Sequence, residues 1–279
     1  MLIIIYETRL YRHTAGKEMK MKHKEIAEVI SQESIATGIY SMWLKCPLVV
    51  SEAKEGQFIS LYCHDGSRIL PRPISICEID KENGTLRIVY RVAGKGTDEF
   101  STYGEGEKIE ILGPLGNGFT LQPEKSAMLM AGGIGIPPMV QTAKQLKAEG
   151  CTDINIVIGY RNAENFLVEE LSKYGKVFIA TEDGSVGTKG NVMDAIKAND
   201  IKADVIYACG PTPMLKAIKN YAIETGTEAW ISMEEKMACG IGACLACVCK
   251  SKDVDHHTHV NNKRVCKDGP VFNAMEVEL

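Results

Sequence analysis

Residues 126–138 read SAMLMAGGIGIPP, and this stretch decides the fold. The apolar run at 127–131 is typical of a buried strand. The glycines that follow let a backbone close on a pyrophosphate group, and the prolines at 137 and 138 suit the first turn of a helix. A strand, a glycine turn and a helix in this order indicate a nucleotide-binding α/β domain, although the spacing departs from G-x-G-x-x-G.

The same alternation continues toward the carboxyl end. Further apolar runs at 154–159, 177–180, 205–208 and 229–231 are separated by helical segments, which predicts a parallel sheet with crossover helices. Cys209-Gly210-Pro211 follows the run at 205–208, and a helix is expected from about Met214. Because open parallel sheets bind ligands beyond the carboxyl ends of their strands, we favour a binding role for this tripeptide over a simple turn around a buried thiol.

Residues 24–119 have a period of two instead. The segment LRIVYRV at 86–92 places apolar residues at its even positions and both arginines at odd positions. Asn83-Gly84, between this run and the preceding one, is a strong hairpin signal. Several short strands with turn residues between them predict a compact antiparallel β-barrel.

Two motifs in the barrel region carry candidate chemistry. Arg72-Pro73-Ile74-Ser75 stands at the start of an expected strand, where Arg72 and the Ser75 hydroxyl can face a phosphate or a flavin ring. Taken alone, this motif is equally well explained as an edge-strand proline beside a surface arginine. Gly94-Lys95-Gly96-Thr97 favours the functional interpretation, because glycine amides, a hydroxyl and a short helix predict a phosphate-binding corner.

The strongest signal is the segment CGIGACLAC at 239–247, a C-x4-C-x2-C run with the spacing of plant-type ferredoxins. A loop that wraps a cluster needs unusual backbone angles, which Gly240 and Gly242 supply. The segment predicts a [2Fe-2S] cluster with four thiolate ligands, Cys239, Cys244, Cys247 and Cys266.

A structural zinc site is the alternative, since Cys244 and Cys247 alone form a C-x2-C knuckle. Cys249 is left outside the ligand set, because an expected strand over 247–249 would point it away from Cys247. The histidines of this region, His256, His257 and His259, are more simply explained by a solvated loop than by metal binding.

The composition excludes other classes of function. A net charge of −4 offers no basic surface for nucleic acid. No apolar run approaches the roughly 18 residues that span a membrane. Ten cysteines in a chain of 279 residues without a secretory signal argue against a disulfide framework and for a reducing cytoplasm.

Together the barrel motifs, the glycine turn and the C-G-P tripeptide resemble the ferredoxin reductase superfamily. The cysteine segment and the sequence VCKDGPVF at 265–272 are similar to the electron-transfer subunit of the NAD-linked, type B dihydroorotate dehydrogenase. This resemblance covers about residues 25–279. It implies a multidomain β and α/β fold with an antiparallel FAD-binding β-barrel at 24–122, an NAD-binding α/β domain at 123–232 and a small [2Fe-2S] module at 233–279. The N-terminal extension at 1–23 departs from the resemblance and is expected to be poorly ordered.

The resemblance also implies cofactors and a partner. FAD would contact Arg72, Pro73, Ile74, Ser75, Val89, Tyr90, Arg91, Gly96 and Thr97. NAD would lie against Gly132, Gly133 and Gly135, with Cys209, Gly210 and Pro211 beside the hydride path. A partner subunit with FMN would oxidise dihydroorotate in a heterotetramer of two copies of each subunit. No residue of this chain is expected to act as a general acid or base, because the cofactors carry the chemistry.

Glu182 and Asp183, at the end of the third strand of the sheet, favour NAD over NADP because carboxylates repel a 2′-phosphate, although Arg161 could offset this. The nearest competing interpretations are the flavin and [2Fe-2S] subunit of an NADH-dependent ferredoxin:NADP reductase, in which an aspartate stands at the position of Cys239, and a hydrogenase flavin subunit. A stand-alone oxygenase reductase would have a longer cluster domain. A zinc-stabilised interaction module would be colourless.

Overall fold

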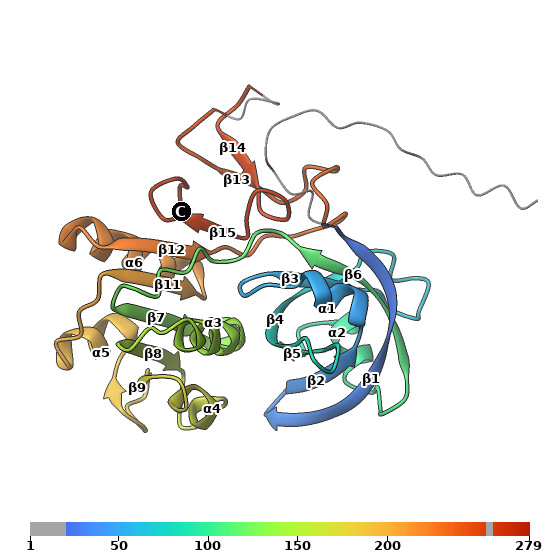
Figure 1. Cartoon of the computed structure of the whole chain (residues 1–279), viewed down its shortest axis with the longest axis horizontal. Coiled ribbons are helices and arrows are strands. Elements are labelled where there is room, and N and C mark those ends of the chain that lie inside the picture. The colour runs from blue at the N-terminus through green and yellow to red at the C-terminus, as the bar shows by residue number, and fades with distance from the viewer. Residues whose placement is uncertain (1–20, 255–258) are drawn as a thin grey trace, which may run out of the picture.

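The chain folds into a β-barrel, an α/β domain and a carboxyl-terminal segment that lies across both (Figure 1). The computed structural model describes residues 21–254 and 259–279. Most of the expected N-terminal extension at 1–23, together with His256 and His257, therefore lies outside the described residues.

The predicted antiparallel barrel is confirmed. Its strands close in the order β1-β2-β5-β4-β3-β6, and every pairing is antiparallel. The turn at Asn83-Gly84 joins β4 to β5, as the sequence indicates. The elements are β1 (His23–Ala36), β2 (Ile39–Lys45), α1 (Pro47–Glu52), β3 (Phe58–Leu61), β4 (Arg72–Asp80), β5 (Thr85–Arg91), α2 (Lys95–Phe100) and β6 (Lys108–Leu115).

Strand β5 separates two environments. Leu86, Ile88 and Tyr90 point into the barrel core, whereas Val89, on the opposite face, packs into the core of the α/β domain. The alternation along β5 therefore corresponds to one face in the barrel core and one face against the α/β domain, and Arg87 is buried on the second face.

The predicted parallel sheet is also confirmed. Its order is β10-β9-β8-β7-β11-β12-β15, and α3 begins directly after the glycine turn. Helix α6 begins at Thr212, slightly before the expected position. The elements are β7 (Ala127–Gly132), η1 (Gly133–Gly135), α3 (Pro137–Ala148), β8 (Ile154–Tyr160), α4 (Val168–Ser172), β9 (Lys176–Thr181), β10 (Thr188–Lys189), α5 (Val192–Ala198), β11 (Val205–Cys209), α6 (Thr212–Thr225) and β12 (Glu228–Ser232).

The carboxyl-terminal segment is more closely joined to the α/β domain than its sequence suggests. It contains β13 (Val248–Lys250), β14 (Asn262–Arg264) and β15 (Val271–Asn273). Strand β15 pairs antiparallel with β12 and becomes the seventh strand of the sheet. A three-residue strand is too short to show a periodicity, so sequence patterning does not reveal it.

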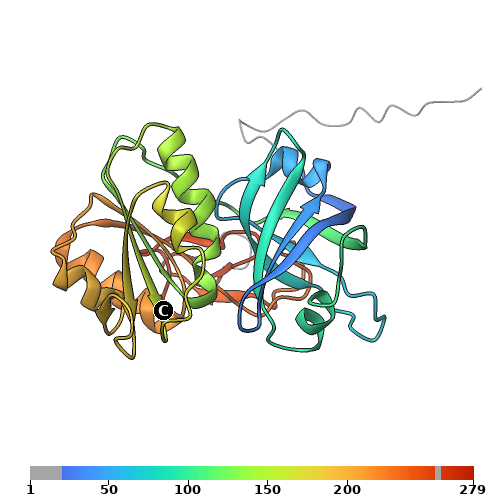
Figure 2. The same cartoon turned by 90° about the horizontal axis from the view of Figure 1, so that it is seen from below.

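Shared cores tie the three parts together. One apolar cluster combines Phe58 and Leu115 of the barrel with the sheet and with Cys247 and Cys266. From below, α3 lies between the sheet and the barrel (Figure 2), where it packs against β4. No helix in the described part of the chain has the length and apolar character to cross a bilayer.

Candidate functional site

The two barrel motifs meet at one corner. Strand β4 begins at Arg72, and α2 begins at Lys95, within the second motif. The guanidinium of Arg72 lies directly against Gly96, because a Cβ built there would lie 2.6 Å from the Arg72 Cζ atom. Only glycine leaves room for this approach. An arginine held over a glycine turn is suited to bind a phosphate, so the corner fits a flavin nucleotide.

The Thr97 side chain stabilises the turn at this corner. Its hydroxyl donates to the Gly94 carbonyl at 3.0 Å and accepts from the amides of Ala93 and Gly94 at 2.9 and 3.2 Å. The side chain is buried. Thr97 therefore holds the shape of the turn, and its hydroxyl is already engaged there.

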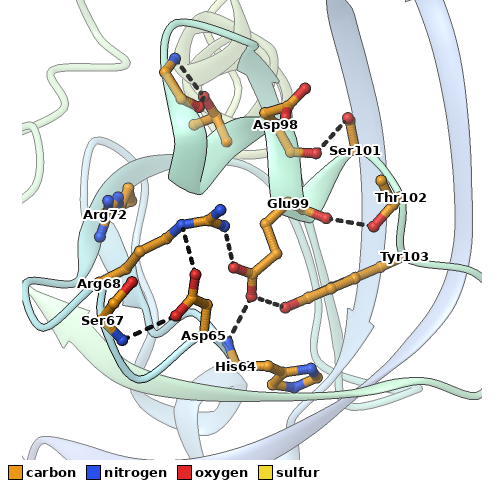
Figure 3. A network of polar contacts seen from close by, with 12 residues as sticks. His64, Asp65, Ser67, Arg68, Arg72, Asp98, Glu99, Ser101, Thr102 and Tyr103 are labelled. Carbon is orange, nitrogen blue, oxygen red and sulfur yellow. Dashed lines mark hydrogen bonds and ion pairs between the residues drawn. The ribbon is translucent and has the colours of Figure 1, made fainter.

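A polar network fixes the loop that leads into Arg72 (Figure 3). Glu99 of α2 pairs with Arg68 and accepts from the His64 amide at 2.6 Å and the Tyr103 hydroxyl at 2.7 Å. Burial opposes ionisation of Glu99, but these hydrogen bonds and the Arg68 charge outweigh it and lower the pKa of the carboxyl. The network thereby joins the loop before Arg72 to helix α2, which begins within the Gly94–Thr97 motif.

The expected flavin contacts on β5 diverge. The Tyr90 hydroxyl donates to Gln32 Oε1 at 2.8 Å inside the barrel, and burial raises its pKa. Its ring therefore faces away from the α/β domain. Arg91, at the strand end, lies beside the glycine turn, since a Cβ at Gly133 would be 3.5 Å from its Nη2 atom. Arg91 thus connects strand β5 of the barrel to the glycine turn of the α/β domain.

The glycine turn and the C-G-P tripeptide also come together. Strands β7 and β11 are neighbours, with Ala131 opposite Cys209. A Cβ at Gly135 would run into the Cys209 carbonyl and lie 2.8 Å from Gly210 Cα. Burial raises the pKa of the Cys209 thiol to about 12, the Ser232 side chain opposes this, and the Glu234 charge adds to it. The site thus offers a neutral thiol and close-packed backbone, which fits a dinucleotide at the strand ends.

The cysteine loop has the backbone that its sequence predicts. Gly240 and Gly242 have φ values of 67° and 85°. Cys239 Sγ accepts from the amides of Ile241 and Ala243 at 3.5 and 3.3 Å, and Cys247 Sγ accepts from the Cys266 amide at 3.4 Å. Backbone donors aimed at sulfur stabilise thiolates.

The thiols associate in pairs. Burial disfavours ionisation of Cys239, but backbone hydrogen bonds and the Cys244 side chain outweigh it and lower its pKa to about 6. Burial, a hydrogen bond with Cys247 and the charges of Cys247 and Cys239 raise the pKa of Cys266 to about 12. Among residues 21–254 and 259–279, no three metal-binding side chains gather around one ion position. Hydrogen bonds thus join Cys239 with Cys244 and Cys247 with Cys266, the four thiols predicted to hold the cluster.

The strand argument that left Cys249 outside the proposed ligand set does not hold in the structure. Strand β13 begins at Val248, and residues two apart on a strand share a face, so alternation does not separate Cys249 from Cys247. Cys249 instead lines a cavity of about 560 Å³ beside Glu235 and Gly210. Burial raises its pKa to about 11, and the Glu235 charge adds to this effect.

The cysteine loop packs on the barrel next to the corner formed by Arg72 and Gly96. A Cβ at Gly240 would lie 3.2 Å from Ser60 Oγ and 3.1 Å from Leu115 Cδ1. Ser60 of β3 is opposite Pro73 of β4. Strand β3 is therefore the one strand between the cysteine loop and the R-P-x-S motif. Electron transfer between a cluster and a flavin requires such a short separation.

A clamp holds this arrangement at the connection between barrel and sheet. The Asn117 amide donates to the Gly269 carbonyl at 2.6 Å, and its side chain donates to the carbonyls of Lys267 and Asp268 at 3.1 and 3.0 Å. These acceptors directly follow Cys266. Sequence patterns did not single out Asn117, because its partners are 150 residues away.

Glu182 and Asp183 occupy the expected end of β9. Their amides donate to the carbonyls of Tyr160 and Arg161 at 3.2 and 3.3 Å, and both side chains are exposed. The Asp183 carboxylate accepts from the Ser185 hydroxyl and amide, and these hydrogen bonds lower its pKa. Two carboxylates thus stand at the strand end where an adenosine ribose would be expected.

Comparisons with known proteins agree with this geometry. Residues 129–220 match a family model described as the oxidoreductase NAD-binding domain. Residues 234–278 match the iron-sulfur cluster binding domain of dihydroorotate dehydrogenase B. A solved structure of the NADH-dependent reduced ferredoxin-NADP oxidoreductase aligns with a TM-score of 0.81 and 31% identity, covering 91% of this chain and 90% of that chain. Phthalate dioxygenase reductase, at 20% identity and a TM-score of 0.60 over 87% of this chain and 94% of its own, shares the fold.

Fold and site together define an iron-sulfur flavoprotein that exchanges electrons with a pyridine nucleotide. The electron transfer subunit of dihydroorotate dehydrogenase B (NAD(+)) from Fusobacterium nucleatum is 43% identical over 88% of this chain and 95% of its own length. The corresponding subunit from Listeria monocytogenes serovar 1/2a is 45% identical over 90% and 98%. The chain belongs to this family of dihydroorotate dehydrogenase B electron transfer subunits.

Proposed function

We propose that this chain carries electrons from a dihydroorotate-oxidising partner to NAD, by way of a [2Fe-2S] cluster held at its cysteine loop and an FAD held at its barrel. The cofactors supply the redox chemistry: a nicotinamide exchanges a hydride, the cluster exchanges single electrons, and a flavin exchanges either. The residues of this chain bind, orient and separate these groups.

Each part of the site has a proposed task. Arg72 binds an FAD phosphate, with Gly96 leaving the space for its guanidinium. Gly133 and Gly135 bind the NAD pyrophosphate, while Cys209 packs beside the nicotinamide as a neutral thiol. The proposed cluster ligands are the four thiols Cys239, Cys244, Cys247 and Cys266. Further cofactor contacts are proposed at Pro73, Ile74, Ser75, Val89, Tyr90, Arg91, Thr97, Gly132, Gly210 and Pro211.

The observation that carries this proposal is the contact between the cysteine loop and the barrel. Gly240 abuts Ser60, and Ser60 pairs with Pro73 of the flavin motif. A loop with two thiol pairs at that position supports single-electron exchange with a flavin bound at Arg72. We retain 24–122, 123–232 and 233–279 as the proposed boundaries of the barrel, the α/β domain and the cluster module.

The proposed partner is an FMN-containing catalytic subunit, in a cytoplasmic heterotetramer with two copies of each chain. The names of the relatives support a catalytic partner, since they are called electron transfer subunits. We place the partner against the cysteine module, where Cys244 is exposed together with the apolar side chains of Ile241 and Leu245.

Reconstitution with the catalytic subunit encoded in the same genome tests the proposal. Dihydroorotate should reduce NAD through the complex, and the purified chain should show flavin and iron-sulfur absorption. A colourless chain that contains zinc would overturn the proposal.

The likeness to the NADH-dependent ferredoxin-NADP oxidoreductase makes that activity the second candidate. Reduced ferredoxin should therefore be offered to the complex as an alternative electron donor. If the complex oxidised ferredoxin and left dihydroorotate unchanged, the second candidate would replace the first.

A further inference from the structure

Arg87 is a buried arginine at the boundary between barrel and α/β domain, and the electron path proposed above does not use it. Its side chain on β5 is 7% exposed. Nε donates to Ser41 Oγ of β2 at 2.8 Å, which fixes the guanidinium on the barrel side. Nη1 donates to Glu170 Oε2 of α4 at 2.5 Å, across the boundary.

A second ion pair crosses the same boundary. Glu78 of β4 lies 4.0 Å from the Arg87 guanidinium and accepts from Lys144 Nζ of α3 at 2.7 Å. We call these four residues, Arg87, Glu170, Glu78 and Lys144, the domain latch. Beside it, the buried Ile79 amide donates to Gln141 Oε1 of α3 at 2.9 Å.

Arg87, the central residue of the domain latch, lies on β5, and this strand also reaches the glycine turn. Arg87 and Arg91 are on the same face of β5, with Val89 between them packed into the α/β core. At about 3.4 Å per residue, Arg87 is roughly 14 Å along the strand from Arg91, which lies beside Gly133. A change in the spacing of the domains at the latch is therefore transmitted to the turn that would hold NAD.

The cluster module, which crosses the top of both domains in Figure 1, attaches them to each other on that side. There β15 joins the sheet, and Asn117 is clamped to the loop after Cys266. Helices α3 and α4 are below. Away from that side, the latch acts together with Cys77 and Val89, which pack into the α/β core, and with the Thr37 amide, which donates to Glu164 Oε1 at 2.7 Å. Loss of the latch would remove the buried ion pairs of this boundary and let the α/β domain shift relative to the barrel.

We propose that Arg87 is a positioning residue for hydride exchange: through Glu170, and through Glu78 to Lys144, it holds the α/β domain where a nicotinamide reaches the flavin. This inference rests on the proposed function. Hydride transfer needs the reacting atoms about 3–3.5 Å apart, so a small rotation of the domain is costly. The contact between cluster loop and barrel involves Gly240 and Ser60, which the latch does not touch.

The test compares two half-reactions in the assembled complex of Glu170→Met. Mixing with NADH should reduce FAD about tenfold to a hundredfold more slowly than in the unchanged complex. Mixing with dihydroorotate should reduce the cluster and FAD at the unchanged rate. Hydrogen exchange of the Ile79 amide gives a readout independent of activity, and it should become faster as the boundary opens.

Matched variants make the test specific. Glu169→Met, on the same helix, removes an equal charge without touching Arg87 and should change none of the three measurements. Arg87→Lys keeps a cation opposite Glu170 and should be impaired less than Arg87→Met. The proposal would be overturned if both half-reactions were slowed equally, or if FAD reduction by NADH were unchanged. It would also be overturned if hydrogen exchange at Ile79 were unchanged, or if Arg87→Lys and Arg87→Met were impaired equally. The unchanged complex tests the proposed function separately, because without NADH-dependent flavin reduction that function fails before any variant is compared.

Discussion

The guanidinium of Arg72 lies where a side chain at residue 96 would begin. This contact brings the start of strand β4 and the first turn of helix α2 together in one corner, and the position of Arg72 requires glycine at residue 96. The nearby network around Glu99 holds the loop that precedes Arg72 in place (Figure 3). The corner proposed to bind FAD is thus defined by packing as well as by its hydrogen-bonding groups.

Replacing Gly96 by alanine should displace Arg72 and weaken FAD binding. A hydrogen bond to a charged group contributes about 1.5–3 kcal/mol, so FAD should bind roughly tenfold to a hundredfold more weakly. Equilibrium dialysis of FAD would measure this. Gly94→Ala is the control, since a Cβ there meets nothing within 4 Å. Equal loss of FAD in both variants would contradict the role assigned to the Arg72 contact.

The proposed ligand set predicts different outcomes for two cysteines of the same segment. Cys239→Ser should lose the cluster, measured as iron and acid-labile sulfide after anaerobic purification, and should keep its FAD. Cys249→Ser should retain the iron, because Cys249 lines the cavity beside Glu235. Loss of iron in Cys249→Ser would show that the ligand set is wrong.

Nucleotide preference should depend on the end of β9. The double variant Glu182→Gln, Asp183→Asn keeps the shape of both side chains and removes two charges that would repel a 2′-phosphate. Its kcat/KM for NADPH relative to NADH should rise about tenfold or more, since a change of about 1.4 kcal/mol corresponds to tenfold. The double variant Glu224→Gln, Asp200→Asn, away from β9, controls for net charge. An unchanged ratio would remove this explanation of the NAD preference.

The Glu99 network should make stability depend on pH. The pKa of Glu99 is below its ordinary value of 4.5 in the folded chain, so its ionised form stabilises the fold above that pH. The stabilisation should be lost as the pH falls below 4.5 through the folded pKa. Glu99→Gln should therefore lower Tm at pH 7 by about 3 °C or more, and the difference from the unchanged chain should shrink in acid.

Thermal denaturation of both chains across the acid range would measure this difference. Glu105→Gln, an exposed neighbour, should show no comparable effect. A difference that stayed constant into acid would mean that the Glu99 charge does not contribute.

Local sequence determined much of this protein. The period of two predicted the barrel strands, the alternation of strands and helices predicted the sheet, and the glycines at 240 and 242 predicted the backbone of the cysteine loop. These features follow from side-chain alternation and from backbone angles that glycine adopts easily, and both act over a few neighbouring residues.

Tertiary structure alone decided which motifs meet. Arg87 and Glu170 are 83 residues apart, and nothing near either of them indicates the other. The contact of Gly240 with Ser60, the clamp at Asn117 and the addition of β15 to the sheet are of the same kind. Such contacts depend on how barrel, sheet and cysteine loop pack together, because burial and ion pairing act between surfaces that are far apart in the sequence.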